Sequence, residues 1–385
     1  MPNMVDYVIW RGDLRMEQFP WNEIDGLLMA TLSYLNFHGA ENAKGWTLEE
    51  ACRLELLQPG NTKSYPGRKR AFEHMAKSER FGQFRMHHFI ALTDKELEMQ
   101  FSAMCIDLPD GTVCVAFRGT DNTIVGWREN FNMAYRTRVP GQEAASAYLS
   151  RVAEATDRPL RLVGHSKGGN LAVYAATKAT PEIQDRIESI WSYDGPGMNL
   201  DISQSEAYGR IKGKIHHYIP QTSIIGLLME YYSPYTVVHS TATGITQHEP
   251  MSWQVIGPHF EERDSIDSTA YVLRDTFHGW LENSTPEQRS EFVDALFKFL
   301  ESTKATKMSD LMNEKLKSLA TIMSGRKEVE PETRKAFTRL MGQAITLGFG
   351  NAVAKVRGKT DSDSDSGQWD TMDDEEDETD QQEEE

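Results

Sequence analysis

The sequence contains little cysteine. Only Cys52, Cys105 and Cys114 occur among its 385 residues, and no two of them form a C-x-x-C pair. This sparse, odd-numbered set argues against a disulfide scaffold, and it lacks the usual sequence mark of a cysteine zinc site or a redox dithiol. Such a chain is expected in a reducing compartment.

Long hydrophobic runs are also missing. The longest apolar block covers residues 224–229, far fewer than the ~20 residues that span a bilayer. Near the N-terminus, Asp6, Arg11 and Asp13 interrupt the stretch where a signal peptide needs an unbroken apolar run. We therefore expect no transmembrane segment and a soluble, cytoplasmic protein.

Basic charge is not in excess. The chain has 41 Lys and Arg residues against 58 Asp and Glu residues. Residues 361–385 hold 14 of the acidic side chains and no basic one, which leaves 44 acidic against 41 basic residues elsewhere. This near-neutral body offers no general field for a phosphate backbone, so nucleic-acid binding is disfavoured. The clustered acids repel one another, and we predict that the tail, residues 357–385, is disordered.

The sequence does have a regular alternation of short apolar strands and helices. A period of two predicts a hairpin over residues 99–107 and 112–117, with Pro109, Asp110 and Gly111 at its turn. Further strands are predicted at 160–163, 189–193, 214–219 and 235–239, and helices at 143–155 and 168–178. This order predicts an α/β fold with a mainly parallel sheet and helices on both faces.

Four regions follow from the patterning. A helical N-terminal segment is predicted over residues 1–95 and the α/β core over 96–262. A helical C-terminal region is predicted over 263–356, where Met312, Leu316 and Leu319 recur at helical spacing, and the acidic tail completes the chain.

The most informative block is the G-x-S-x-G pattern of residues 164–168, with Ser166 at its centre. It follows an apolar strand and precedes an alanine-rich helix, which is the context of a nucleophile elbow. At such a turn the glycines leave room for a sharp bend, and the serine hydroxyl projects from the sheet edge. The alternative is a strand-to-helix turn that only needs glycine. A phosphate-binding loop is disfavoured because the one Gly-Lys-Thr, residues 358–360, has Val353 where the first glycine should stand.

A nucleophilic serine also needs donors for the oxyanion. The strand of residues 112–117 ends in Arg118, Gly119 and Thr120. Its glycine turn can bring the backbone N–H of Thr120 beside that of Lys167, the residue after the serine. The alternative is an ordinary strand end with Arg118 paired to a carboxylate.

The blocks VAFRGTDNTIVGW at 115–127 and GHSKGGNLA at 164–172 resemble the class 3 lipases of the α/β-hydrolase fold. Closer still is the resemblance to a bacterial lipase-like branch of unknown function, which shares blocks like YDGPG at 193–197, IPQTSIIGLL at 219–228 and QHEPMSWQV at 247–255. The resemblance covers roughly residues 20–260. It implies an α/β-hydrolase fold, and it places Trp127 in the lid region of those enzymes.

In hydrolases of this fold the acid and then the histidine follow the serine along the chain. Asp194 ends the strand at 189–193 and is the predicted acid, although a turn cap is the alternative. Class 3 lipases usually carry the acid after the next strand, where this sequence has Ser223. For the base, His248 on a late loop is the first choice, His239 the second and His259 the third.

No metal and no cofactor are expected. His87 and His88 are neighbours on a predicted strand, as are His216 and His217, so each pair should face opposite ways and make a poor metal site. Apolar residues that could contact a substrate are Trp127, Ile224 and Leu227, although plain core is an equally good interpretation.

Two functions are consistent with these patterns. The first is a serine hydrolase that cleaves a carboxylic ester, lipid-like or otherwise apolar, with Ser166 as nucleophile, His248 as base and Asp194 as acid. The second is an inactive hydrolase-fold scaffold whose C-terminal region binds a protein partner. The serine at position 223 favours the second.

Overall fold

The computed structural model describes residues 2–297, except for 60–64, 122, 134–135, 224, 230–233 and several positions between 269 and 296. The predicted acidic tail lies outside the described residues, as does most of the predicted helical region at 263–356.

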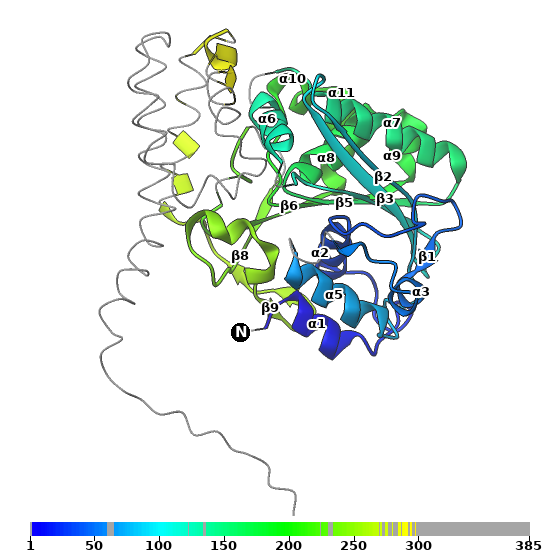
Figure 1. Ribbon diagram of the computed structural model, residues 1–385. Coiled ribbons are helices and arrows are strands. Elements are labelled where there is room, and N and C mark those ends of the chain that lie inside the picture. Colours follow the sequence, from blue (N-terminus) through cyan, green and yellow to red (C-terminus); the bar gives the residue numbers. More distant parts are fainter. Residues whose placement is uncertain are drawn as a thin grey trace, which may run out of the picture.

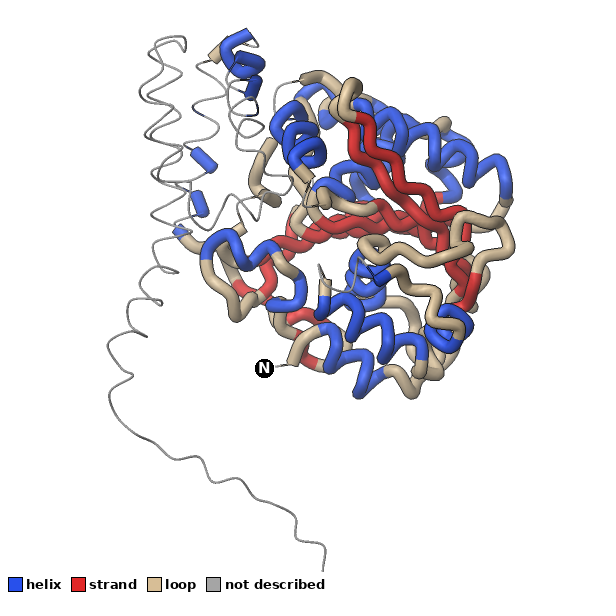
Figure 2. The backbone as a smooth tube through the Cα atoms, viewed as in Figure 1, coloured by secondary structure: helices blue, strands red, loops and turns tan. Residues whose placement is uncertain are grey.

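A nine-stranded sheet forms the centre of the described part, with helices on both of its faces (Figures 1 and 2). The strand order is β1-β2-β3-β4-β5-β6-β7-β8-β11, and a separate ribbon pairs β9 with β10. The bounds are β1 (Trp46–Thr47), β2 (Arg85–Asp94), β3 (Met99–Asp107), β4 (Val113–Phe117), β5 (Leu160–His165), β6 (Ile187–Tyr193), β7 (Ile215–Pro220), β8 (Tyr235–Val238), β9 (Val255–Ile256), β10 (His259–Phe260) and β11 (Glu262–Arg263).

The sheet changes from antiparallel to parallel at β4. β3 and β4 form the predicted hairpin, with Asp107 opposite Val113. From β4 to β8 every neighbouring pair is parallel. Parallel neighbours need long crossover connections, and between β4 and β7 these connections contain helices. The predicted α/β fold is thus confirmed.

Two helical layers cover the sheet. The helices of the first layer precede β3 in the chain: α1 (Met4–Arg11), α2 (Glu23–Leu32), α3 (Leu48–Arg53) and α5 (Pro66–Ala76). Those of the second include α7 (Pro140–Ala155), α8 (Lys167–Lys178) and α11 (Glu206–Ile211). Further helices whose bounds the structure describes are α6 (Ile124–Met133), α9 (Pro181–Arg186), α10 (Leu200–Ser203), and the short 3-10 turns η1 (Lys212–Lys214), η2 (Gly244–His248) and η3 (Pro250–Ser252).

Strand β4 shows how the sequence fixes the two layers. All of its residues are buried, but they alternate between the two cores: Cys114 and Ala116 pack with the first layer, and Val113, Val115 and Phe117 with the second. A strand covered on both faces needs apolar side chains at every position, which explains its continuous apolar sequence.

The N-terminal segment, predicted as helical over 1–95, also contributes the strands β1 and β2. Of β2, only a strand around His87 and His88 was predicted, without bounds, because β2 lies near the sheet edge and its burial follows no period of two. The usual strand signal is therefore weak.

The prediction that His87 and His88 face opposite ways is wrong. The register between β2 and β3 shifts between His87 and Ile90, and His88 adopts a φ of 50°. Such a bulge rotates one side chain out of the alternation of the strand, and the two rings lie with their centroids 4.7 Å apart. On β7 the alternation holds, since His216 is exposed and His217 is buried.

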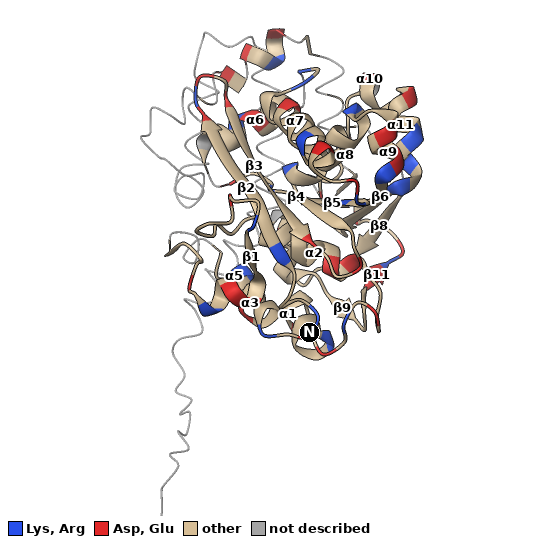
Figure 3. Ribbon diagram, turned by 90° about the vertical axis from the view of Figure 1, so that its right-hand side faces the viewer, with Lys and Arg blue, Asp and Glu red and all other residues tan. Residues whose placement is uncertain are grey.

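The described surface carries mixed charge. Acidic and basic residues are both present along the ribbon of α9 and α11 in Figure 3. Among the helices that the structure describes, none has the length and apolar composition needed to cross a bilayer.

Candidate active site

Ser166 joins the end of β5 to the start of α8 in a sharp turn. Its backbone has a φ of 59° and a ψ of −134°, a region that costs a residue with a side chain about 1–3 kcal/mol. Its N–H donates to Tyr193 O at the end of the neighbouring strand β6 (2.9 Å). This strained strand-to-helix turn at the carboxyl edge of the sheet is the backbone expected of a nucleophile elbow.

Two glycines allow the end of β4 to meet this turn. A Cβ at Gly168 would stand 2.2 Å from Phe117 O, and one at Gly119 would stand 2.5 Å from His165 O and 3.0 Å from Ser166 Cβ. Both positions therefore exclude any other residue without a shift of backbone. The close approach brings the residues after β4 beside the serine.

The backbone N–H groups of Thr120 and Lys167 both lie in this region. Neither donates a hydrogen bond to any residue that the structure describes. Lys167 is the first residue of α8, where backbone N–H groups have no acceptor within the helix and the helix dipole favours negative charge. Asn130 on α6 donates to Thr120 Oγ1 (2.6 Å) and so holds that residue in place.

The side chain of Lys167 forms a buried ion pair, which its position in the motif did not predict. Its Nζ is fully buried and lies 2.7 Å from Glu129 Oε2, and it also donates to Gln100 Oε1 (2.9 Å). Glu129 Oε1 accepts from Gly141 N (2.7 Å). This buried ion pair ties the start of α8 to α6, to β3 and to the start of α7.

Asp194 and His248, predicted as acid and base, lie in direct contact. His248 Nδ1 is 2.6 Å from Asp194 Oδ2. The second carboxylate oxygen, Oδ1, accepts from Ser223 Oγ (2.5 Å) and from Gly226 N (3.0 Å). The hydroxyl of Ser223, at the position where the resemblance to class 3 lipases places the acid, therefore donates to the predicted acid, Asp194.

The loop that carries His248 is fixed by its neighbours. Trp253 is fully buried and its Nε1 donates to Gln247 O (2.8 Å). Gln247 in turn exchanges two hydrogen bonds with Thr222. The His248 side chain remains 25% exposed, so its ring is held from one side and open on the other.

His165, the residue before Ser166, connects the serine turn to the loop of His248. The rings of His165 and His248 have centroids 4.6 Å apart, and Asp194 directly follows Tyr193, which binds Ser166 N. Within the described part of the chain, Ser166 Oγ forms no hydrogen bond. Since Nδ1 of His248 faces Asp194, its Nε2 is the nitrogen left for the serine. In enzymes without substrate this bond is often long and tightens on binding.

His165 holds the loop of the predicted base. Its Nε2 donates to His248 O (2.8 Å), so its Nδ1 is the acceptor and lies 3.0 Å from Tyr34 Oη. Burial and the neighbouring His248 lower the pKa of His165 well below its usual value, which keeps this ring neutral. Arg68 lies over the Tyr34 ring, 3.9 Å from its centroid, and its guanidinium is 3.1 Å from Glu249.

The two alternative bases lie elsewhere with partners of their own. His239 Nδ1 is 3.0 Å from Glu261 Oε2. His259 is largely exposed, and its Nδ1 is 2.8 Å from Glu23 Oε1. The structure brings neither of them to Ser166 or Asp194.

A small pocket of about 100 Å³ opens beside Ser166, and its walls are mostly apolar. Of the predicted substrate contacts, Trp127 lines it, whereas Leu227 packs in a separate core cluster and Ile224 lies outside the described residues. The pocket is lined by Trp127, Asn130, Phe131, Met133, Ser166, Lys167, Pro196, Ile225, Leu228 and Met229.

The supporting residues of this site were not predicted from the sequence. Tyr34, Gln100 and Glu129 come from parts of the chain far from the motifs and reach the site only through the fold. Ser223 gave a signal, since a hydroxyl replaces the usual acid there, but its meaning depends on the position of Asp194.

Comparison with known proteins gives one match by sequence family. The family model described as Mbeg1-like matches residues 75–298, more than half of the chain. None of the curated proteins matches significantly. Among solved structures, the chain is similar to M37 lipase, with 15% identity and a TM-score of 0.36 over 54% of this chain and 70% of that one. It is also similar to a triacylglycerol lipase from Penicillium expansum, with 14% identity and a TM-score of 0.28 over 44% of this chain and 72% of the other.

Proposed function

The chain belongs to the Mbeg1-like family, and from its site we propose that it is a serine hydrolase that cleaves carboxylic esters through an acyl-enzyme. The observation that carries the proposal is the pairing of Asp194 with His248 beside a strained serine turn. A turn that only needed glycine would not require a serine in this conformation. It would not require a buried carboxylate aimed at a histidine either.

The reaction would run in two halves. Ser166 Oγ attacks the acyl carbon while His248 Nε2 takes the hydroxyl proton, and the negative oxygen of the tetrahedral intermediate is bound by the N–H groups of Thr120 and Lys167. His248 then gives the proton to the leaving alcohol, which departs and leaves the acyl group on Ser166. Water repeats the sequence, frees the acid and restores the serine.

Asp194 would keep His248 in the required tautomer. Its Oδ2 faces Nδ1, so that nitrogen carries the proton and Nε2 is free to accept. The hydrogen bonds from Ser223 and Gly226 supply the donors that a fully buried carboxylate needs.

The pocket favours a short apolar acyl group. Its volume of about 100 Å³ is well below the roughly 300–1,000 Å³ of sites that hold drug-sized ligands. Trp127, Leu228 and Met229 supply an apolar wall, and no charged group other than the paired Lys167 lies among its lining residues.

A fluorophosphonate probe tests the nucleophile. We expect the wild-type chain to gain one covalent adduct, measured by intact mass, because the phosphorus reacts as the acyl carbon would. The Ser166→Ala variant should gain none. Ser150→Ala, on α7 and remote from the site, is the matched control and should be labelled like the wild type. A folded wild-type chain that stays unlabelled would contradict the proposal.

A series of p-nitrophenyl esters tests the pocket. We expect kcat/KM for the butyrate to exceed that for the palmitate by about 10-fold or more, since a small pocket rejects added methylenes. Trp127→Ala should narrow this ratio, whereas Trp10→Ala on the exposed face of α1 should leave it unchanged. Preference of the wild type for palmitate would overturn the assignment of a short acyl group.

A further inference from the structure

A second pocket, of about 560 Å³, lies between α7 and the antiparallel half of the sheet. Its walls include His87 and His88 on β2, Cys105 and Asp107 on β3, and Tyr148 on α7. None of these residues takes part in the proposed ester hydrolysis.

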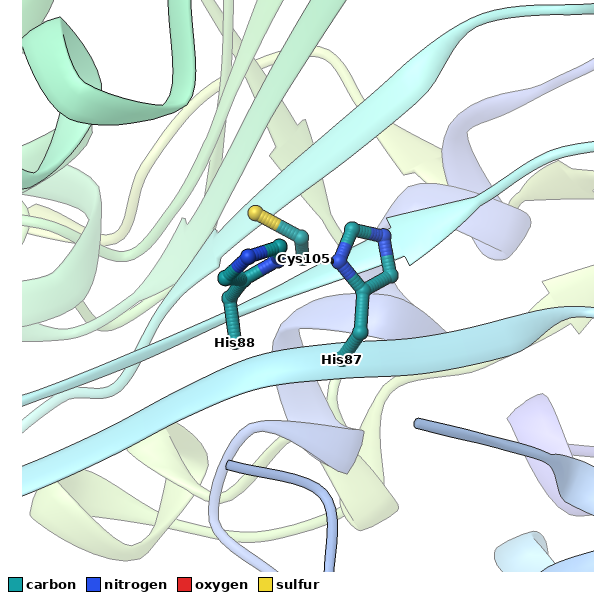
Figure 4. Close-up of side chains that lie close together, drawn as sticks. All are labelled: His87, His88 and Cys105. Atoms are coloured by element: carbon teal, nitrogen blue, oxygen red, sulfur yellow. Dashed lines mark hydrogen bonds between the residues drawn. The ribbon is translucent and has the colours of Figure 1, made fainter. Parts of the chain in front are cut away.

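Three metal-ligating side chains meet in this pocket. One ligand atom each from His87, His88 and Cys105 lies within 4.8 Å of the other two. Figure 4 shows both rings rising from β2 toward Cys105 on β3. The two Nδ1 atoms are 2.5 Å apart, so one nitrogen of each ring faces the same region.

The backbone is shaped to produce this arrangement. Cys105 lies directly opposite His87 in the register, so the two share one face of the sheet. His88 would lie on the other face of a regular strand, but the bulge and its positive φ of 50° bring it to the same side. Bulges often re-aim a side chain next to a functional site.

The next layer of side chains fits metal ligands as well. Asp107 Oδ1 lies 3.3 Å from Nε2 of His87, the ring nitrogen that faces away from the cluster. A carboxylate on the far nitrogen is the usual support of a metal-bound histidine. Tyr148 Oη donates to His88 O (2.8 Å) and lies 3.3 Å from Cys105 Sγ, so it fixes the bulge against the thiol.

We propose that His87, His88 and Cys105 form a zinc site, with the pocket providing the fourth coordination position. Two imidazoles and one thiolate are donors that Zn²⁺ prefers. In a tetrahedral site with bonds of roughly 2.0–2.3 Å, ligand atoms lie about 3.3–3.6 Å apart. Side-chain rotations that move the ligand atoms by about one ångström convert the observed spacings into this geometry.

Zinc binding displaces the thiol proton. The Cys105 thiol loses its proton to water when the sulfur coordinates the ion as a thiolate. The charges that line the pocket balance, since Glu41 and Asp107 stand against Arg151 and Arg158, and Arg158 is paired with Asp107 (2.5 Å). No net positive field therefore opposes the cation.

The pocket of the proposed zinc site opens toward the amino ends of β4 and β5, whereas the proposed active site lies at their carboxyl ends. Asp107 is opposite Val113 at the amino end of β4, and Arg158 precedes β5. Ser166 follows the carboxyl end of β5. The zinc proposal therefore does not depend on the proposed hydrolysis, and each can fail without the other.

Cobalt and zinc titrations of the full chain, first freed of metal with a chelator, test the site. We expect Co²⁺ to give a near-ultraviolet thiolate-to-cobalt band at one equivalent and Zn²⁺ to abolish it. Cys105→Ser should lose the band, whereas Cys52→Ser and Cys114→Ser should keep it, since neither thiol belongs to the cluster.

Zinc affinity, measured against a chromophoric chelator, gives the second readout. Loss of the carboxylate in Asp107→Asn should weaken binding about 10- to 100-fold, and His88→Ala should weaken it at least as much. His216→Ala, from the other adjacent pair, should bind like the wild type. Circular dichroism of each variant without metal checks the fold. The site would be refuted if the wild type showed no cobalt band. It would also be refuted if folded Cys105→Ser and His88→Ala variants bound zinc as tightly as the wild type.

Discussion

Replacement of Asp194 by asparagine should lower kcat for ester hydrolysis by about 10⁴-fold, the order expected when the acid of a serine triad loses its charge. An asparagine can donate its amide N–H to His248 Nδ1. That nitrogen then becomes the acceptor, and the proton moves to Nε2, where it blocks the serine. The negative charge that stabilises the imidazolium is lost as well.

The substitution suits a clean measurement because asparagine tolerates the backbone of this position. Asp194 has a φ of 48°, and asparagine is among the few residues that often adopt the left-handed region. Steady-state kinetics on a short acyl ester and a thermal melt give the two readouts. Asp185→Asn, an exposed aspartate on α9, is the matched control and should be fully active. A kcat within tenfold of the wild type would remove Asp194 from the proposed triad.

Replacement of Lys167 by methionine should reduce the free energy of unfolding by about 3–5 kcal/mol. The change leaves Glu129 fully buried with its partner charge removed, and the hydrogen bonds from Nζ to Gln100 are lost. Breaking a buried pair from one side is costly because the remaining charge cannot be hydrated.

Urea unfolding of three variants separates the charge from the packing. Lys167→Met combined with Glu129→Gln should recover part of the loss, since a neutral amide can still accept from Gly141 N. Lys178→Met in the last turn of the same helix is exposed and should change stability by less than about 0.5 kcal/mol. If Lys167→Met alone is as stable as Lys178→Met, the pair does not hold the elbow in place.

The parts of the molecule that follow from local pattern were predictable. The hairpin of β3 and β4 and the strand and helix around Ser166 appear in the sequence as changes of apolar period and as glycine spacing. The α/β fold follows from the order of these elements. Ser166 stands out for the same reason, because an elbow places all of its constraints within five residues.

The rest depends on contacts between distant parts of the chain. The residues around His87 and His88 give no sequence signal for the bulge in β2. The bulge nevertheless changes the face of the sheet on which the His88 side chain lies. The Lys167 side chain appears in the motif only as a variable position, yet it pairs with Glu129 on another helix. Such pairings need the register and the helix placement, which a single sequence does not contain.

Residues that precede the family match contact the neighbours of His248, and this bears on which part of the chain the proposed active site needs. The family match starts at residue 75, but Tyr34 and Arg68, which lie ahead of that boundary, brace His165 and Glu249 on either side of the histidine loop. The residues that support the proposed active site thus extend beyond the region matched by the family model. A fragment limited to that region would contain Ser166, Asp194 and His248 but would lack the contacts of Tyr34 and Arg68.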